Sequence, residues 1–202
     1  MIENLLKLET KCIMLVELIK NIFMVIKHYS ALMKFIHWAM AVQIIVLLVI
    51  GFYMSDLSWG DSRKILVMVH KSCGVTAIVF IIARIFARLF TQVPESSGNF
   101  AVKFTSQLTS FFLYVFMAAM AFSGFIMSDM GGHVITFFNL IDLPLLFKKN
   151  EDLAKKFHAI HVCIALPLVI LIGLHLLGAL YHHFILRDNV LTRMLPRVCS
   201  RK

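Results

Sequence analysis

Charge is scarce in this sequence: 15% of its 202 residues are Asp, Glu, Lys or Arg, whereas 60% are hydrophobic. Soluble globular domains carry about a quarter charged residues. Long apolar runs dominate instead, and this composition excludes an ordinary soluble protein. We therefore predict an all-α integral membrane protein, and the length suits one domain.

Closely spaced cysteines are also missing. No CxxC motif occurs among the four cysteines, which argues against a zinc site and against covalent attachment of a c-type haem. We interpret Cys73 and Cys163, each just after a membrane histidine, as small packing residues. No nucleic-acid-binding motif is present, so the net charge of +9 is attributed to basic residues that flank membrane spans, and no nucleic-acid partner is expected.

Four apolar segments are long enough to cross a bilayer as helices. Successive spans alternate in direction, which gives an antiparallel, up-and-down four-helix bundle embedded in membrane lipid. Residues 92–104 have the composition of a loop, and residues 131–156 form the longest connection. We expect one four-span domain over residues 27–202, with spans near 29–54, 64–90, 105–130 and 153–184.

Residues 1–26 form an N-terminal extension without a signal-peptide cleavage site. Two interpretations stay open: a helix lying on the inner membrane face, or a natural start at Met24. Basic residues near the span ends are more numerous on the side that holds both termini, so we place both termini in the cytoplasm.

Histidines lie inside three of the spans. His161 and His175 are 14 residues apart in the fourth span, so a helix brings them within about 40° of one face and roughly 21 Å apart along its axis. His37 comes early in the first span and His70 early in the second. Because successive spans run in opposite directions, His37 shares the inner depth with His175, and His70 shares the outer depth with His161. The sequence predicts two facing pairs, one near each side of the bilayer core.

Facing imidazoles in an apolar bundle are typical axial ligands of a non-covalent haem. We therefore predict two haems, the inner one ligated by His37 and His175 and the outer one by His70 and His161. Arg84 lies 14 residues after His70, which brings it to the inner depth, where a guanidinium suits a haem propionate. Simple anchoring of the span end is the alternative for Arg84.

Other histidines leave alternatives open. His158 is a rival to His161 as a ligand, although it is 17 residues from His175 and roughly 100° off that face. His182, seven residues after His175, is expected near a haem propionate, a quinone head group or the membrane interface. Zinc or copper transport would favour carboxylates or thiolates beside the histidines, and the spans offer almost no acidic residue. A haem-free adaptor with structural histidines is a further alternative.

Four segments together resemble the bacterial cytochrome b561 family of the inner membrane, over roughly residues 27–197. They are IHWAM around His37, VHKSCG around His70, the spacing from His161 to His175, and the tail YHHFILRDNVLTRMLPR. The resemblance implies a four-helix bundle with two haems b at these positions, electron exchange with the ubiquinone pool, and a small periplasmic reductant or redox protein as donor, superoxide among the candidates.

With histidine at both axial positions the iron has no open site, so we expect electron transfer rather than oxygen binding. Whether the chain is an oxidoreductase of the superoxide:ubiquinone type or an electron carrier stays open, and a cytochrome b subunit anchoring a hydrogenase or dehydrogenase is the alternative. Four lysines lie on the outer side: Lys148, Lys149, Lys155 and Lys156. They would form a basic surface that steers a small anion or docks such a partner. A solvated loop is the simpler interpretation of the same residues.

Overall fold

The computed structural model describes Met14, residues 29–91 and residues 99–196. The N-terminal extension discussed above, including the alternative start at Met24, lies outside these residues except for Met14. The described elements follow one another as α2 (Ala31–Asp56), α3 (Asp61–Phe90), α4 (Phe100–Met130), β1 (Ile135–Phe137), β2 (Ile141–Leu143), α5 (Glu151–Phe184) and α6 (Val190–Met194).

Four helices, α2 to α5, are each long and apolar enough to cross a membrane. Three of them, α2, α4 and α5, begin where a side chain satisfies a free backbone N–H group: Ser30 accepts from Met33 in α2, and Asn150 accepts from Leu153 in α5. The predicted spans are close to these helices. The predicted loop over residues 92–104 was too long at its end, because Asn99 caps α4 and starts it at Phe100.

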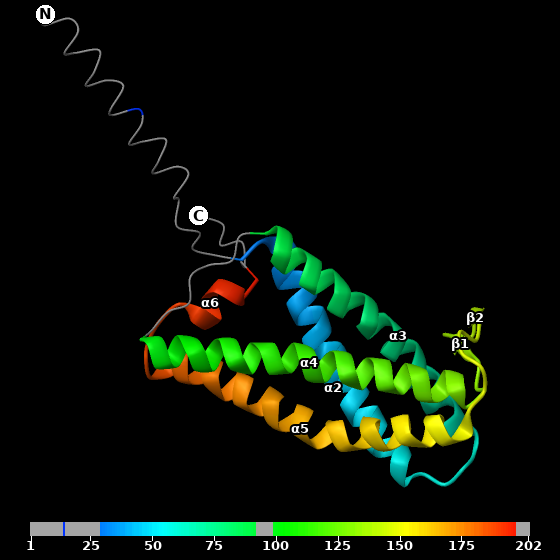
Figure 1. The fold of residues 1–202 in the computed structure, drawn as a ribbon. Coiled ribbons are helices and arrows are strands. Elements are labelled where there is room, and N and C mark those ends of the chain that lie inside the picture. The colour runs from blue at the N-terminus through cyan, green and yellow to red at the C-terminus, as the bar shows by residue number, and fades with distance from the viewer. Residues whose placement is uncertain (1–13, 15–28, 92–98, 197–202) are drawn as a thin grey trace, which may run out of the picture.

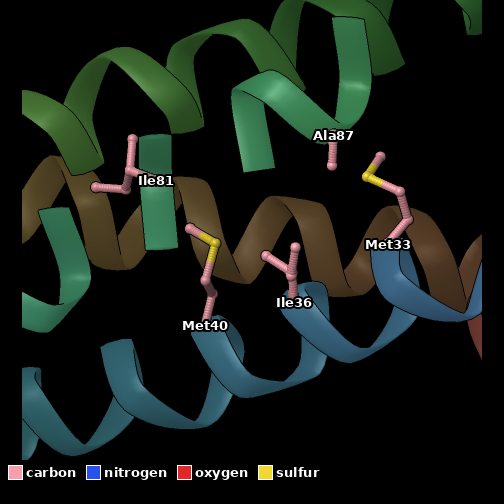
Figure 2. Close-up of a cluster of buried hydrophobic side chains, with 5 residues drawn as sticks. All are labelled: Met33, Ile36, Met40, Ile81 and Ala87. Carbon is pink, nitrogen blue, oxygen red and sulfur yellow. The ribbon is translucent and has the colours of Figure 1, made fainter. Parts of the chain in front are cut away.

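The helices form an antiparallel bundle in which α4 lies beside α5 and α2 lies beside α3 (Figure 1). We call the end that carries β1 and β2 the hairpin end and the opposite end the α6 end. Near the α6 end, apolar side chains of α2 point toward α3 (Figure 2). This buried cluster consists of Met33, Ile36, Met40, Ile81 and Ala87. The mostly helical, four-helix architecture confirms the predicted fold class.

A β-hairpin in the connection between α4 and α5 was not predicted. Its strands pair antiparallel, with Phe137 opposite Ile141, and its turn places Phe138 and Asn139 at positive φ, 46° and 58°. The fully buried Ser72 of α3 accepts the Phe138 N–H at 2.9 Å. The hairpin therefore depends on a contact with a helix residue more than 60 positions away in the sequence. No local sequence pattern predicts such a contact.

The rest of this connection is held by Asp129, a buried carboxylate near the end of α4. Its two oxygens accept the backbone N–H groups of Leu146 and Phe147, each at 2.9 Å. Hydrogen bonds to a charged acceptor are the stronger kind, and a buried donor left unpaired costs about 1–3 kcal/mol. Asp129 thus fixes the loop that leads back into α5.

We predict that Asp129→Ala lowers the thermal unfolding midpoint in detergent by several degrees, because it leaves two backbone donors without their acceptor. Asp129→Asn, which keeps one acceptor oxygen, should fall between Asp129→Ala and the parent chain. Asp142→Ala, at an exposed carboxylate, is the control. Equal midpoints for the Asp129 and Asp142 variants would contradict the assignment.

Candidate functional site

Four histidines face one another in two pairs, one toward each end of the bundle. At the α6 end, the ring centroids of His37 and His175 are 6.2 Å apart, with 61° between the ring planes. At the hairpin end, those of His70 and His161 are 6.3 Å apart, with 80° between the planes. The structure brings together the residues that were paired by depth, while their role as ligands stays a prediction.

The separation within each pair suits one metal ion between two imidazoles. A metal–imidazole bond is ~2.0 Å long and a ring nitrogen lies ~1.1 Å from its ring centre, so two imidazoles on opposite sides of one metal have centroids ~6.2 Å apart. Edge-to-face packing also occurs at about 4.5–7 Å, but packing alone gives no reason for the same separation at two depths along one helix. Ligation of one metal ion by each pair would give this separation at both depths.

A cavity of about 320 Å³ opens beside the hairpin-end pair. Both His70 and His161 line it, together with Ile135 of β1 and mostly apolar residues of the four long helices. This volume is within the usual range of small-molecule pockets, and a predominantly apolar lining with a few polar groups is typical of them. The hairpin-end pair is therefore placed to hold a largely apolar cofactor.

Two glycines make room for this pair. A Cβ on Gly51 of α2 would lie 3.3 Å from Cε1 of His70, and a Cβ on Gly124 of α4 would lie 2.9 Å from Cε1 of His161. The second distance is too short for any side chain, so His161 would have to move. Reasoning from the sequence did not identify Gly51 as a site residue. It lies 14 residues after His37 and thus on nearly the same helix face.

His161 is also oriented by hydrogen bonds. Its Nδ1 lies 2.9 Å from the carbonyl oxygen of Met120 and 3.3 Å from Oγ of Ser123. A carbonyl only accepts, so Nδ1 carries the proton and Nε2 is the unprotonated nitrogen available to a metal. Nδ1 of His70 is buried near the Leu47 backbone but forms no well-aligned hydrogen bond with the described residues.

Arg84 lies within electrostatic range of both His37 and His175, as its spacing from His70 predicts. Its Nε donates to Oη of Tyr114 at 2.8 Å. This bond leaves the two terminal nitrogens of the guanidinium for another acceptor. Tyr114 of α4 was missed, because a tyrosine in an apolar span is more often a packing residue.

His182 belongs to a different arrangement. Its ring is buried, and its Nδ1 lies 2.6 Å from Oδ2 of Asp188. Burial alone would raise the pKa of Asp188. The net effect is a lowered pKa, because the carboxylate is stabilised by its hydrogen bonds with His182 and the Val190 N–H and by nearby positive charges. His182 holds the turn after α5, and its expected place beside a propionate or quinone stays a prediction.

The remaining candidates lie at the hairpin end. His158 is exposed on α5 and lines the same cavity as His161, but the ring facing His70 is that of His161. Nζ of Lys149 pairs with Glu151 at 2.9 Å. Lys148, Lys155 and Lys156 are exposed. In the described part of the chain, no three His, Cys, Asp or Glu side chains meet as a metal site.

Comparison with known proteins decides the family. A model of the prokaryotic cytochrome b561 family matches residues 28–197. The chain belongs to the prokaryotic cytochrome b561 family. It is 30% identical to "Probable superoxide oxidase CybB" of Yersinia pestis, over 85% of this chain and 97% of that protein. It is also 26% identical to "Cytochrome b561 homolog 2" of Escherichia coli (strain K12), over 86% of this chain and 94% of that protein.

Membership of the cytochrome b561 family makes the chain a multi-pass membrane protein of electron transport and implies haem b as its cofactor. The residues fit this cofactor: facing imidazoles at a suitable separation, an apolar cavity beside one pair, and glycines where a larger residue would displace an imidazole. The family assignment that the four sequence segments suggested is thereby confirmed.

We predict that Gly124→Ala reduces haem content, because the added Cβ displaces the His161 ring. Gly173→Ala is the matched control, since nothing lies within 4 Å of its added Cβ. Haem per chain from the pyridine haemochrome spectrum is the measurement. Full haem content in Gly124→Ala, with an unchanged low-spin electron paramagnetic resonance signal, would show that His161 does not need its present position.

Proposed function

We propose that this cytochrome carries electrons across the membrane through two haems b, held by His37 with His175 and by His70 with His161. The observation that carries the proposal is the pair of centroid separations, 6.2 and 6.3 Å. His161 and His175 are 14 residues apart on α5, so the pairs are roughly 21 Å apart along that helix, inside a bilayer core of about 30 Å.

Haem b supplies a reversible one-electron iron couple when bound. The chain would contribute two imidazoles to each haem, from His37 with His175 and from His70 with His161, and an iron held by both would have no site for oxygen. At His161, the Met120 carbonyl holds the tautomer that leaves Nε2 for the metal. Electron transfer without oxygen activation is the chemistry that this donor set supports.

Arg84 is proposed to bind a propionate of the haem at the α6 end. Its Nε is held by Tyr114, so the terminal N–H groups have a fixed direction toward a carboxylate. A guanidinium is positively charged at every physiological pH, and a carboxylate is its natural partner in an apolar interior.

The proposed donor is superoxide at the hairpin end, and the proposed acceptor is ubiquinone. The name of the Yersinia relative supports the donor. The balanced reaction oxidises two superoxide ions to two molecules of oxygen, and their two electrons with two protons convert ubiquinone to ubiquinol. We place the hairpin end in the periplasm and both termini in the cytoplasm of a bacterial inner membrane, with residues 27–202 as one domain and residues 1–26 as an extension.

The lysines at the hairpin end support an anionic donor. Lys148, Lys155 and Lys156 are exposed there, whereas Lys149 is partly neutralised by Glu151. Exposed charges of one sign attract small ions of the opposite sign and raise their encounter rate. The same surface would suit an acidic redox partner, which co-purification of a second subunit would reveal.

We predict two haems b per chain, with one lost in His70→Ala, His161→Ala, His37→Ala or His175→Ala. His158→Ala should keep both and is the control for the rival ligand. Pyridine haemochrome counts and reduced-minus-oxidised spectra are the measurements. A colourless parent protein would support a haem-free adaptor, and loss of haem only in His158→Ala would reassign the hairpin-end ligand.

We predict that replacing Lys148, Lys155 and Lys156 together with Gln slows electron uptake from superoxide several-fold at low salt, because the attraction is removed. The difference from the parent should shrink as salt screens the charges. Lys103→Gln, in α4 near the α6 end, is the control. If the rate of electron uptake by the parent chain did not change with salt concentration, electrostatic steering would be contradicted.

A further inference from the structure

The β-hairpin exposes large apolar side chains although it lies outside the long helices. Leu140 is 79% exposed and Ile141 is 63% exposed. Three further apolar residues, Leu145, Leu146 and Phe147, follow it and are exposed as well. In water such a group would be an unfavourable surface patch, so its surroundings need an explanation.

The hairpin has an apolar face and a polar face. Its register pairs Ile135 with Leu143 and Phe137 with Ile141, and it pairs Thr136 with Asp142 between them. Because side chains alternate across a strand, the first two pairs share one face, while Thr136 and Asp142 share the other. A segment with this division suits a boundary between apolar and aqueous surroundings, as amphipathic interfacial helices do.

The depth of the hairpin agrees with such a boundary. Ser72, which accepts the Phe138 N–H, is two residues after His70, and Ile135 lines the cavity with His70 and His161. The two histidine pairs are roughly 21 Å apart along α5 in a core of about 30 Å. With the pairs centred in the core, the hairpin-end pair lies about 4–5 Å inside the hydrocarbon boundary. The inner edge of the hairpin is therefore at membrane depth.

The chain returns to the aqueous side soon after the hairpin. Exposed Leu145, Leu146 and Phe147 are followed at once by Lys148 and Lys149. Apolar residues next to lysines are characteristic of a segment that passes from acyl chains to lipid head groups, where ammonium groups meet phosphates. Figure 1 shows the hairpin standing to the side of α4 and α5 at this end of the bundle, beside α3.

We infer that the hairpin Ile135–Leu143 is an interfacial membrane ribbon, with Leu140 and Ile141 in contact with lipid acyl chains of the leaflet at the hairpin end and Asp142 directed to the head groups and water. Ile135 lies on the same face as Ile141 but at the open end of the hairpin, where it is buried and lines the cavity, so the ribbon also separates the hairpin-end histidine pair from lipid. This inference uses the depth of the pairs along α5 and holds whether or not they bind haem.

Spin labels in lipid nanodiscs test the inference. In the full chain with its four native cysteines replaced by serine, a nitroxide is attached at Ile141→Cys or at Asp142→Cys. Val79→Cys, 61% exposed on α3, reports lipid contact, and Lys148→Cys reports the head-group side. The measurement is collision of each label with oxygen, which concentrates in lipid, and with a water-soluble nickel chelate.

We expect the oxygen-to-nickel collision ratio at position 141 to approach that at position 79 and to exceed that at position 142 several-fold. A ratio at position 141 equal to that at position 148 would overturn the inference, since the ribbon would then lie in water. Low collision rates with both reagents at position 141 would also overturn it, because a protein surface would cover the residue. Unchanged size-exclusion profiles establish that each labelled variant is folded.

Discussion

A helix advances roughly 21 Å in 14 residues and returns to nearly the same face, and this spacing fits within a bilayer core of about 30 Å. Three helices of this cytochrome carry site residues with this 14-residue spacing. On α5 it separates His161 from His175, on α3 it separates His70 from Arg84, and on α2 it separates His37 from Gly51. Each helix therefore presents one site residue at each of two depths. The contact between Gly51 and His70 and the proximity of Arg84 to the other pair show that these depths coincide across helices.

Helix α4 has no histidine, yet both depths depend on it. At the hairpin end it supplies Gly124, whose missing side chain admits the His161 ring, and the Met120 carbonyl that fixes the proton on that ring. At the α6 end it supplies Tyr114, which holds Arg84. Within a membrane a polar group must find its partner inside the protein. A helix that ligates nothing can therefore determine which nitrogen of a neighbouring imidazole is available.

The spans and the histidine pairs were predictable because both follow from regular geometry: apolar length for the spans, and helical pitch with alternating direction for the pairs. The hairpin was not, since its strands have three residues each and its turn is held by Ser72, which is distant in sequence. The same limit applies to His182. Its place on the His175 face suggested a cofactor, but a turn after α5 brings Asp188 to its Nδ1, and only the folded chain shows that turn.

The two ends of the bundle are closed by different means, and both involve the helices that carry histidines. At the α6 end, Nζ of the buried Lys34 donates to the Leu195 carbonyl and Trp38 donates to the Met194 carbonyl, so the segment after α5 is tied to α2 on either side of His37 in sequence. At the hairpin end, the turn after β1 is tied to α3 by the hydrogen bond from the Phe138 N–H to Ser72, two residues from His70. Each closure attaches a connecting segment within one helical turn of a histidine. Movement of either segment would therefore shift a helical turn that carries a histidine, so the position of each imidazole depends on a connecting segment as well as on its own helix.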